Sequence, residues 1–106
     1  MDAAEQLSRY CINDRRLLTE GDASSDGVLD ARTDALVRIA LLIAAHAPGA
    51  SFHAALDDAV AAGASLDQIV AVLDASRTVV GLPRTVAAAQ RILAALGLDE
   101  DLADVR

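Results

Sequence analysis

The sequence contains no lysine, no tryptophan and a single cysteine, Cys11. A lone cysteine cannot form a disulfide within the chain, and the polar opening MDAAEQLSRY is unlike a signal peptide, so we expect a reducing, cytoplasmic compartment. The lack of lysine excludes Schiff-base chemistry. The only aromatic residues are Tyr10 and Phe52, which leaves a core of small and aliphatic side chains.

Positive charge is also scarce. Nine arginines stand against sixteen aspartates and glutamates, which gives a net charge of −7. Nucleic acids and anionic membrane surfaces select for basic proteins, so both are disfavoured as partners. The longest apolar run, 39-IALLIAA-45, is far shorter than the ~20 residues that cross a bilayer. We expect neither a cofactor nor a bound metal.

Apolar residues, by contrast, make up 54% of the chain, and many of them are alanine. They recur at helical spacing, and no stretch alternates as a strand would, so the predicted fold class is all-α. With 106 residues the chain is expected to be one domain. A domain of this size buries only ~60–70% of its unfolded surface, so a chain this apolar is expected to bury more as a homo-oligomer.

The apolar periodicity predicts four long helices and a short one before them, over residues 31–46, 50–62, 66–80, 83–96 and 3–12. The corresponding division is an N-terminal arm and linker (1–28), a helical domain (29–97) and an acidic C-terminal tail (98–106) that forms at most one short helix.

Local signals set the predicted helix ends. Asp30 caps the first long helix, and 47-APG-49 breaks it. Ser65 and Gln68 form a capping-box pattern before the third, and Pro83 falls in the first turn of the fourth.

The layout of 29-LDARTDALVRIALLIA-44, 61-AAGAS-65, 66-LDQIVAVLDA-75 and 81-GLP-83 resembles the carboxymuconolactone decarboxylase and alkylhydroperoxidase AhpD-like superfamily. The likeness covers residues 29–97. It implies an AhpD-like helical bundle that assembles as a trimer or hexamer, with a pocket close to a subunit interface.

The resemblance also locates the positions of the family's catalytic groups. Its glutamate falls on Ala35, its two cysteines on Pro48 and Ser51, and its histidine on Ala55. Because peroxide reduction needs an attacking and a resolving thiol, we expect no thiol peroxidase activity. The loss of the histidine weakens the decarboxylase assignment too. A peroxidase that uses Cys11 between chains is a third, minor alternative.

Arg77 is the polar residue that the apolar pattern highlights. At 100° per residue it falls within the stripe formed by Leu66, Val70 and Leu73. A buried guanidinium needs a partner. Arg77 therefore has one of two roles. It is structural and pairs with Asp74 or with an acid of another subunit, or it anchors a ligand that carries a carboxylate, enolate or phenolate.

Each of several other polar residues could have either a functional or a structural role. Asp57 is four residues after His53 and can orient its ring, as in an acid–base pair, or the two form a surface pair. His46 either contributes to a ligand site or caps a helix C-terminus. Ser51 and Ser76 could hydrogen-bond a ligand, although Ser51 could instead cap its helix. No Ser–His relay is expected, since helical residues two apart do not face each other.

Outside this region, Tyr10 and 14-DRR-16 could cover the pocket as a lid or, as we prefer, pack as an arm on the oligomer. Arg84 is expected to face solvent or a neighbouring subunit.

The sequence therefore predicts a redox-inactive, carboxymuconolactone decarboxylase-like protein that binds a small oxygenated or anionic organic molecule. Non-redox lyase, isomerase or cyclase chemistry would use His53, Asp57 and Arg77, with His46, Ser51 and Ser76 as further ligand contacts. The alternative is a non-catalytic oligomeric binding or interaction module that has lost the family active site.

Overall fold

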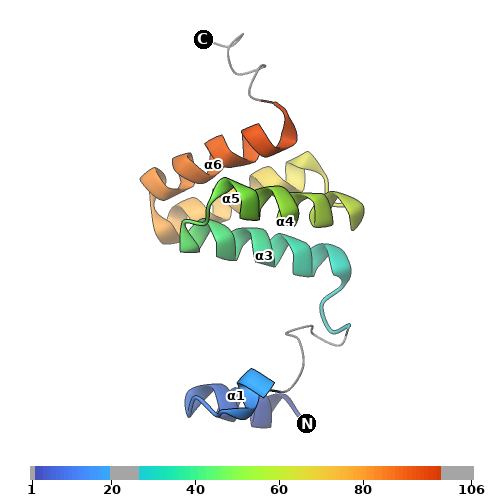
Figure 1. Cartoon of the computed structure of the whole chain (residues 1–106), viewed down its shortest axis with the longest axis vertical. Coiled ribbons are helices and arrows are strands. Elements are labelled where there is room, and N and C mark those ends of the chain that lie inside the picture. The colour runs from blue at the N-terminus through green and yellow to red at the C-terminus, as the bar shows by residue number, and fades with distance from the viewer. Residues whose placement is uncertain (1, 20–26, 99–106) are drawn as a thin grey trace.

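The computed structural model describes residues 2–19 and 27–98, and over these ranges the protein is all-α (Figure 1). The helices are α1 (Ala3–Cys11), α2 (Arg16–Thr19), α3 (Ala31–Ala45), α4 (Gly49–Ala61), α5 (Leu66–Val80) and α6 (Leu82–Leu96). The predicted fold class is confirmed. The acidic tail beyond residue 98, where one short helix was expected, lies outside the described residues.

Helices α3 to α6 pack together as a four-helix unit. α3 packs against α4 and α5, and α6 packs against the same two helices from the other side. Figure 1 shows these four helices stacked, with α1 lying apart from them beside the N-terminus. The unit therefore contains its own core, while the arm contributes nothing to it.

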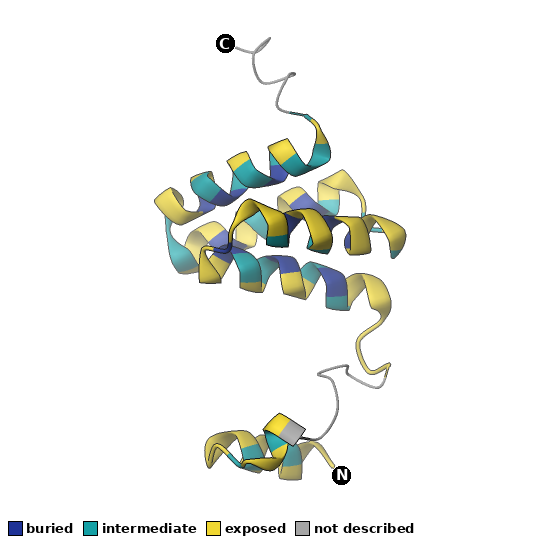
Figure 2. Ribbon diagram, viewed as in Figure 1, coloured by how far each residue is buried: buried dark blue, intermediate teal, exposed yellow. Residues whose placement is uncertain are grey.

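The core lies on the inward faces of the four helices (Figure 2). Its largest fully buried side chains are Ile39, Ile43, Phe52, Leu56 and Ile69. Between them lie small buried residues, including Ala35, Ala47, Ala59 and Ala88. Alanine at these positions lets neighbouring helices approach closely, as a chain with so few bulky side chains requires.

The four long helices and the short N-terminal one were predicted to within a residue at each end, because their termination signals are local. The Ser65 hydroxyl accepts from Gln68 N at 3.1 Å, and Gln68 Oε1 accepts from Ser65 N at 3.0 Å, which completes the expected capping box. The single turn of α2 was missed. Val60 of α4 is 56% exposed although it is apolar, because the buried face of this helix centres on Phe52, Leu56 and Ala59.

The start of α3 gives a prediction about pH. The Asp30 carboxylate accepts a 2.7 Å hydrogen bond from Thr33 N, and this bond lowers the pKa of Asp30 below its ordinary value of 3.8. A carboxylate with a depressed folded-state pKa stabilises the fold above its unfolded pKa, and this contribution is lost as pH falls through the folded pKa.

We expect wild-type protein to lose this part of its stability as pH falls below about 3.8. Asp30→Asn keeps a capping oxygen but does not titrate, so its stability should fall less over the same interval. Thermal unfolding of both proteins from pH 6 to pH 2 measures the difference. Parallel curves would show that Asp30 does not contribute to the pH dependence.

Candidate functional site

A groove lies between α3 and α4, with a volume of about 600 Å³. Small and aliphatic side chains form most of its surface, and charged groups lie along its edges. The lining residues are Ala31, Asp34, Ala35, Arg38, Leu41, Leu42, Ser51, Ala54, Ala55, Asp58 and Ala62.

The groove exists because alanines face each other across two packed helices. On α4 the lining positions follow helical spacing, so Ser51, Ala55 and Asp58 lie along one side of the helix, next to its buried face. On α3, Ala35 is buried at the edge of the core. A methyl group at such positions leaves space that a larger side chain would fill.

The groove's polar groups come from both helices. Arg38 Nε donates to Asp34 Oδ2 at 2.8 Å, an ion pair four residues apart on α3. Asp58 of α4 is exposed, and Ser51 is half-buried. The groove thus offers a guanidinium held in place by a carboxylate, one hydroxyl and one further carboxylate above an apolar floor.

This groove coincides with the positions that the family resemblance assigns to catalytic groups. Ala35, Ser51 and Ala55 all line it. The family's fourth position, Pro48, is instead the N-cap residue of α4. These positions are not packed solid, so a hollow is present where the resemblance expects reactive side chains.

Arg77 does not occupy the buried position expected for it. It is exposed, as are Leu66 (52%) and Val70 (45%), which share its side of α5. The inward face carries Ile69 and Ser76 and is rotated by about 90° from that stripe. Arg77 therefore needs no buried partner within the chain, and it does not line the groove.

Because Arg77 is exposed, its replacement is expected to change the stability of the protein only slightly. Arg77→Met should change the free energy of unfolding by less than about 0.5 kcal/mol, as is usual at exposed positions. Urea unfolding at fixed protein concentration, with the exposed Val79→Met on the same helix as control, measures it. A loss of several kcal/mol would mean that Arg77 is buried in an assembly.

His53 and Asp57 are brought together, as their spacing predicted. Nε2 of His53 lies 3.7 Å from Oδ2 of Asp57, and both side chains are mostly exposed. Neither lines the groove. Their catalytic roles remain predictions, and within one chain they lie on α4 outside the groove.

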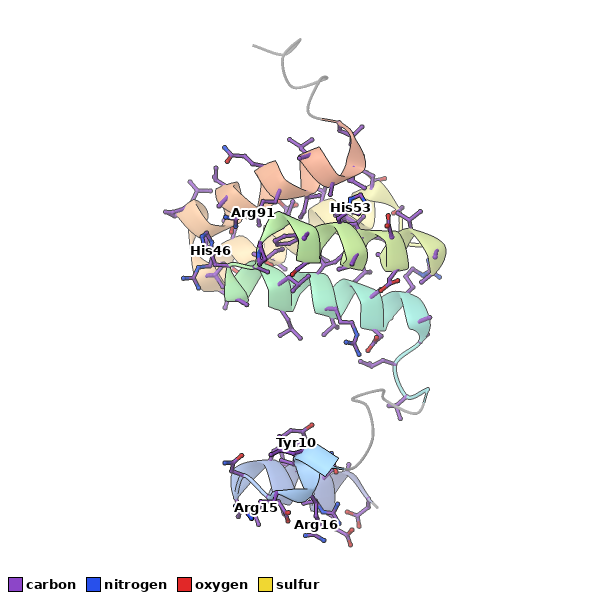
Figure 3. All side chains as sticks on the ribbon, viewed as in Figure 1. Tyr10, Arg15, Arg16, His46, His53 and Arg91 are labelled. Atoms are coloured by element: carbon purple, nitrogen blue, oxygen red, sulfur yellow. The ribbon has the colours of Figure 1, made fainter. Side chains whose placement is uncertain are left out.

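His46 ends α3 as its C-cap residue in the left-handed conformation, with φ of 55°. Its Nδ1 lies 3.5 Å from the Arg91 guanidinium of α6 (Figure 3). Arg84, expected to face solvent, is exposed but also donates to the carbonyl oxygen of Ala44 at 2.7 Å. The Arg84 guanidinium thus meets the carbonyl end of α3, where a helix favours positive charge. This arrangement ties α6 to α3.

The two serines differ in availability. Ser51 lines the groove, and the expectation that it caps α4 is wrong, because Pro48 is the N-cap residue and no side chain caps this helix. Ser76 is buried, and its hydroxyl donates to the carbonyl oxygen of Val72 at 2.8 Å. Ser51 is thus placed to meet a ligand in the groove, whereas Ser76 is hydrogen-bonded within α5.

Sequence reasoning missed three groove residues, Asp34, Arg38 and Asp58. Two signals could have found them. Asp34 and Arg38 are spaced as an i,i+4 ion pair, and Ala35 lies between them in the sequence. Asp58 is three residues after Ala55 and so lies on the same side of α4.

Within residues 2–19 and 27–98, no three His, Cys, Asp or Glu side chains gather closely enough to hold a metal ion. None of the helices in those ranges combines the length and apolar character that crossing a bilayer requires.

The fold and the groove define an all-α helical unit with an open, largely apolar hollow between two of its helices. The model of that family, the carboxymuconolactone decarboxylase family, matches residues 14–95. The chain belongs to this family. The match begins at Asp14 and so includes α2, which precedes the domain boundary predicted at residue 29. No curated protein and no solved structure matches the chain.

Proposed function

We propose that the α3/α4 groove binds a small organic molecule that is mainly apolar and carries an oxygen function, such as a carboxylate, phenol or carbonyl. The observation that supports this most is the open groove at Ala35, Ser51 and Ala55. Its volume of about 600 Å³ is within the range of small-molecule sites, which are mostly apolar with a few polar groups.

In this proposal Arg38 and Ser51 recognise the ligand's oxygen atoms. The planar guanidinium of Arg38 can donate two parallel hydrogen bonds, and Asp34 fixes its orientation. The alanines and Leu41 contact the apolar part. No thiol step is involved, because the only cysteine, Cys11, is on α1.

Non-redox chemistry on the bound molecule is the finer form of the proposal. Asp58 is the groove carboxylate outside the Asp34–Arg38 pair and could accept a proton, and Arg38 could stabilise developing negative charge. His53, Asp57 and Arg77 could take the predicted catalytic roles only if an assembly brings them to a groove.

A second candidate is a binding module without catalysis. It is favoured by the groove's lining, which contains neither histidine nor cysteine, and by the exposure of Asp58. Both candidates keep the predicted cytoplasmic, homo-oligomeric protein with a small-molecule partner.

Ala55→Leu tests the proposed site. The added side chain should fill the groove and weaken binding of benzoate, measured by calorimetry, at least tenfold, or ~1.4 kcal/mol. Ala61→Leu is the matched control, because Ala61 is exposed on the same helix outside the groove. Equal affinities of the two variants would place the site elsewhere.

Arg38→Met separates the roles of charge and shape. Charge-assisted hydrogen bonds contribute about 1.5–3 kcal/mol, so benzoate should bind at least tenfold more weakly. Phenol, which is uncharged at pH 7, should lose much less. An equal loss for both probes would assign Arg38 a role in the shape of the groove.

A further inference from the structure

The N-terminal helix α1 presents an apolar face that nothing else in residues 2–19 and 27–98 covers. Ala3, Leu7, Tyr10 and Cys11 fall on one side of the helix. Leu7 is 66% exposed, Tyr10 is 61% exposed, and α1 buries no residue at all. Helices shorter than ~12–15 residues are marginal in water, so this nine-residue helix needs a packing partner.

The polar side of the arm is already satisfied. Asp2 caps α1 by accepting from Glu5 N at 2.8 Å. Asp14 accepts from the Arg16 guanidinium, with a shortest distance of 2.6 Å, and these bonds lower the pKa of Asp14 to about 2. The arm thus has a defined polar face, with Arg16 pointing away from Tyr10 (Figure 3). What remains without a partner is the Leu7–Tyr10 face.

The α3/α4 groove offers a largely apolar surface for such a face. Its lining includes alanines of both helices, among them Ala35, Ala54 and Ala55, whose small side chains allow a third helix to approach closely. Laying the apolar face of an amphipathic helix into such a groove is a common mode of recognition. Leu41 in the groove's lining is 61% exposed, and Val37, one turn earlier on α3 and outside the lining, is 42% exposed and extends the apolar surface.

Charge permits this contact between two copies of the chain. Residues 27–98 contain six aspartates and five arginines, and residues 2–19 contain three acidic residues and three arginines. Both parts are therefore close to neutral, and the net charge of −7 comes mainly from residues 20–26 and 99–106. Near-neutral surfaces associate without strong repulsion.

The connection between arm and unit is long enough for exchange. Eleven residues separate the end of α2 from the start of α3, and a chain of that length spans at most about 40 Å. The arm lies away from the four-helix unit of its own chain (Figure 1). Exchange of an identical element between protomers forms closed assemblies in which each copy gives one arm and receives one.

We infer that α1 of one copy packs its Leu7–Tyr10 face over the α3/α4 groove of a second copy. The open groove then becomes a pocket with Tyr10 of the partner subunit as part of its wall. The docking stands on the exposed face and the groove alone, whereas the pocket's role in ligand binding rests on the proposed function.

The native Cys11 provides a direct test, because it lies on the docking face. Wild-type chain is mixed with ¹⁵N-labelled Cys11→Ser/Ala54→Cys, which moves the only cysteine into the groove. Copper phenanthroline in air oxidises the thiols, and intact mass spectrometry counts the mixed disulfide. The control is ¹⁵N-labelled Cys11→Ser/Val79→Cys, since Val79 is 83% exposed on α5 and outside the groove.

We expect the mixed disulfide with Ala54→Cys to form at least tenfold faster than with Val79→Cys. Leu7→Asp in the wild-type chain should remove this difference, whereas Ser8→Asp, the same charge on the polar side of α1, should leave it. Equal rates for the two partner cysteines would overturn the docking. So would a chain with both Cys11 and Ala54→Cys that forms only an intrachain disulfide at high dilution.

Benzoate affinity separates the two proposals. If the arm docks and completes the pocket, Leu7→Asp should weaken benzoate binding and Ser8→Asp should not. Selective crosslinking without benzoate binding would retain the docking and reject the proposed function. Benzoate binding that is unaffected by Leu7→Asp, together with unselective crosslinking, would reject the docking and retain the proposed function.

Discussion

Phe52→Ala is expected to lower the free energy of unfolding by about 3–5 kcal/mol, the range found when a buried phenylalanine is truncated. Phe52 is 0% exposed and is the largest of the fully buried side chains. The core cluster to which it belongs also contains small residues such as Ala59 and Ala88, whose side chains cannot extend to fill a space. The loss therefore includes the cost of a cavity.

This loss is large relative to the 5–15 kcal/mol that stabilises a typical domain. Urea unfolding followed by circular dichroism, at one fixed protein concentration, gives the difference directly. Val79→Ala is the control, since a side chain 83% exposed on α5 should contribute less than about 0.5 kcal/mol. Similar losses in the two variants would show that Phe52 is not central to the core.

Gly81→Ala is expected to destabilise the protein by about 1–3 kcal/mol, because its backbone conformation is essentially restricted to glycine. Gly81 has φ of 89° and ψ of 163° and joins α5 directly to α6. Its N–H donates to the Arg77 carbonyl oxygen at 3.1 Å, and its own carbonyl accepts from the Thr85 hydroxyl at 2.9 Å. The turn cannot relax without losing these bonds.

Gly49→Ala is the matched control for this substitution. Gly49 is the first residue of α4, has no positive φ, and has open space where a Cβ would lie. Alanine there should be neutral or stabilise by about 0.4–1 kcal/mol, because it restricts the unfolded chain. The two variants should thus shift the thermal midpoint in opposite directions or by clearly different amounts. A Gly81→Ala protein as stable as Gly49→Ala would contradict the constraint on the turn.

The α3/α4 groove lies where the family resemblance expects catalytic groups. Ala35, Ser51 and Ala55 occupy those positions in this chain, and all three line the hollow between α3 and α4. Larger side chains that fill such a space commonly stabilise a protein, so the open groove leaves some stability unused. A groove bordered by Arg38 is the reason to test ligands before assigning the protein a purely structural role.

The sequence by itself determined the helices and their ends, except for the single turn of α2. Their periodicity is a property of consecutive residues, and their termination depends on caps within three or four positions, as at Asp30 and Ser65. The reach of Asp57 to His53 was predictable for the same reason. The family was readable from the order and spacing of several such segments.

Only the tertiary structure decided which side of each helix faces inward and where space is left. Two apolar stripes overlap on α5, one with Leu66 and Val70 and the other with Ile69, and periodicity cannot choose between them. Packing chose the second, because Ser76 can be buried once its hydroxyl donates to the helix backbone. The groove depends likewise on which residues of α3 and α4 face each other, and that is a property of the packed helices and not of either segment.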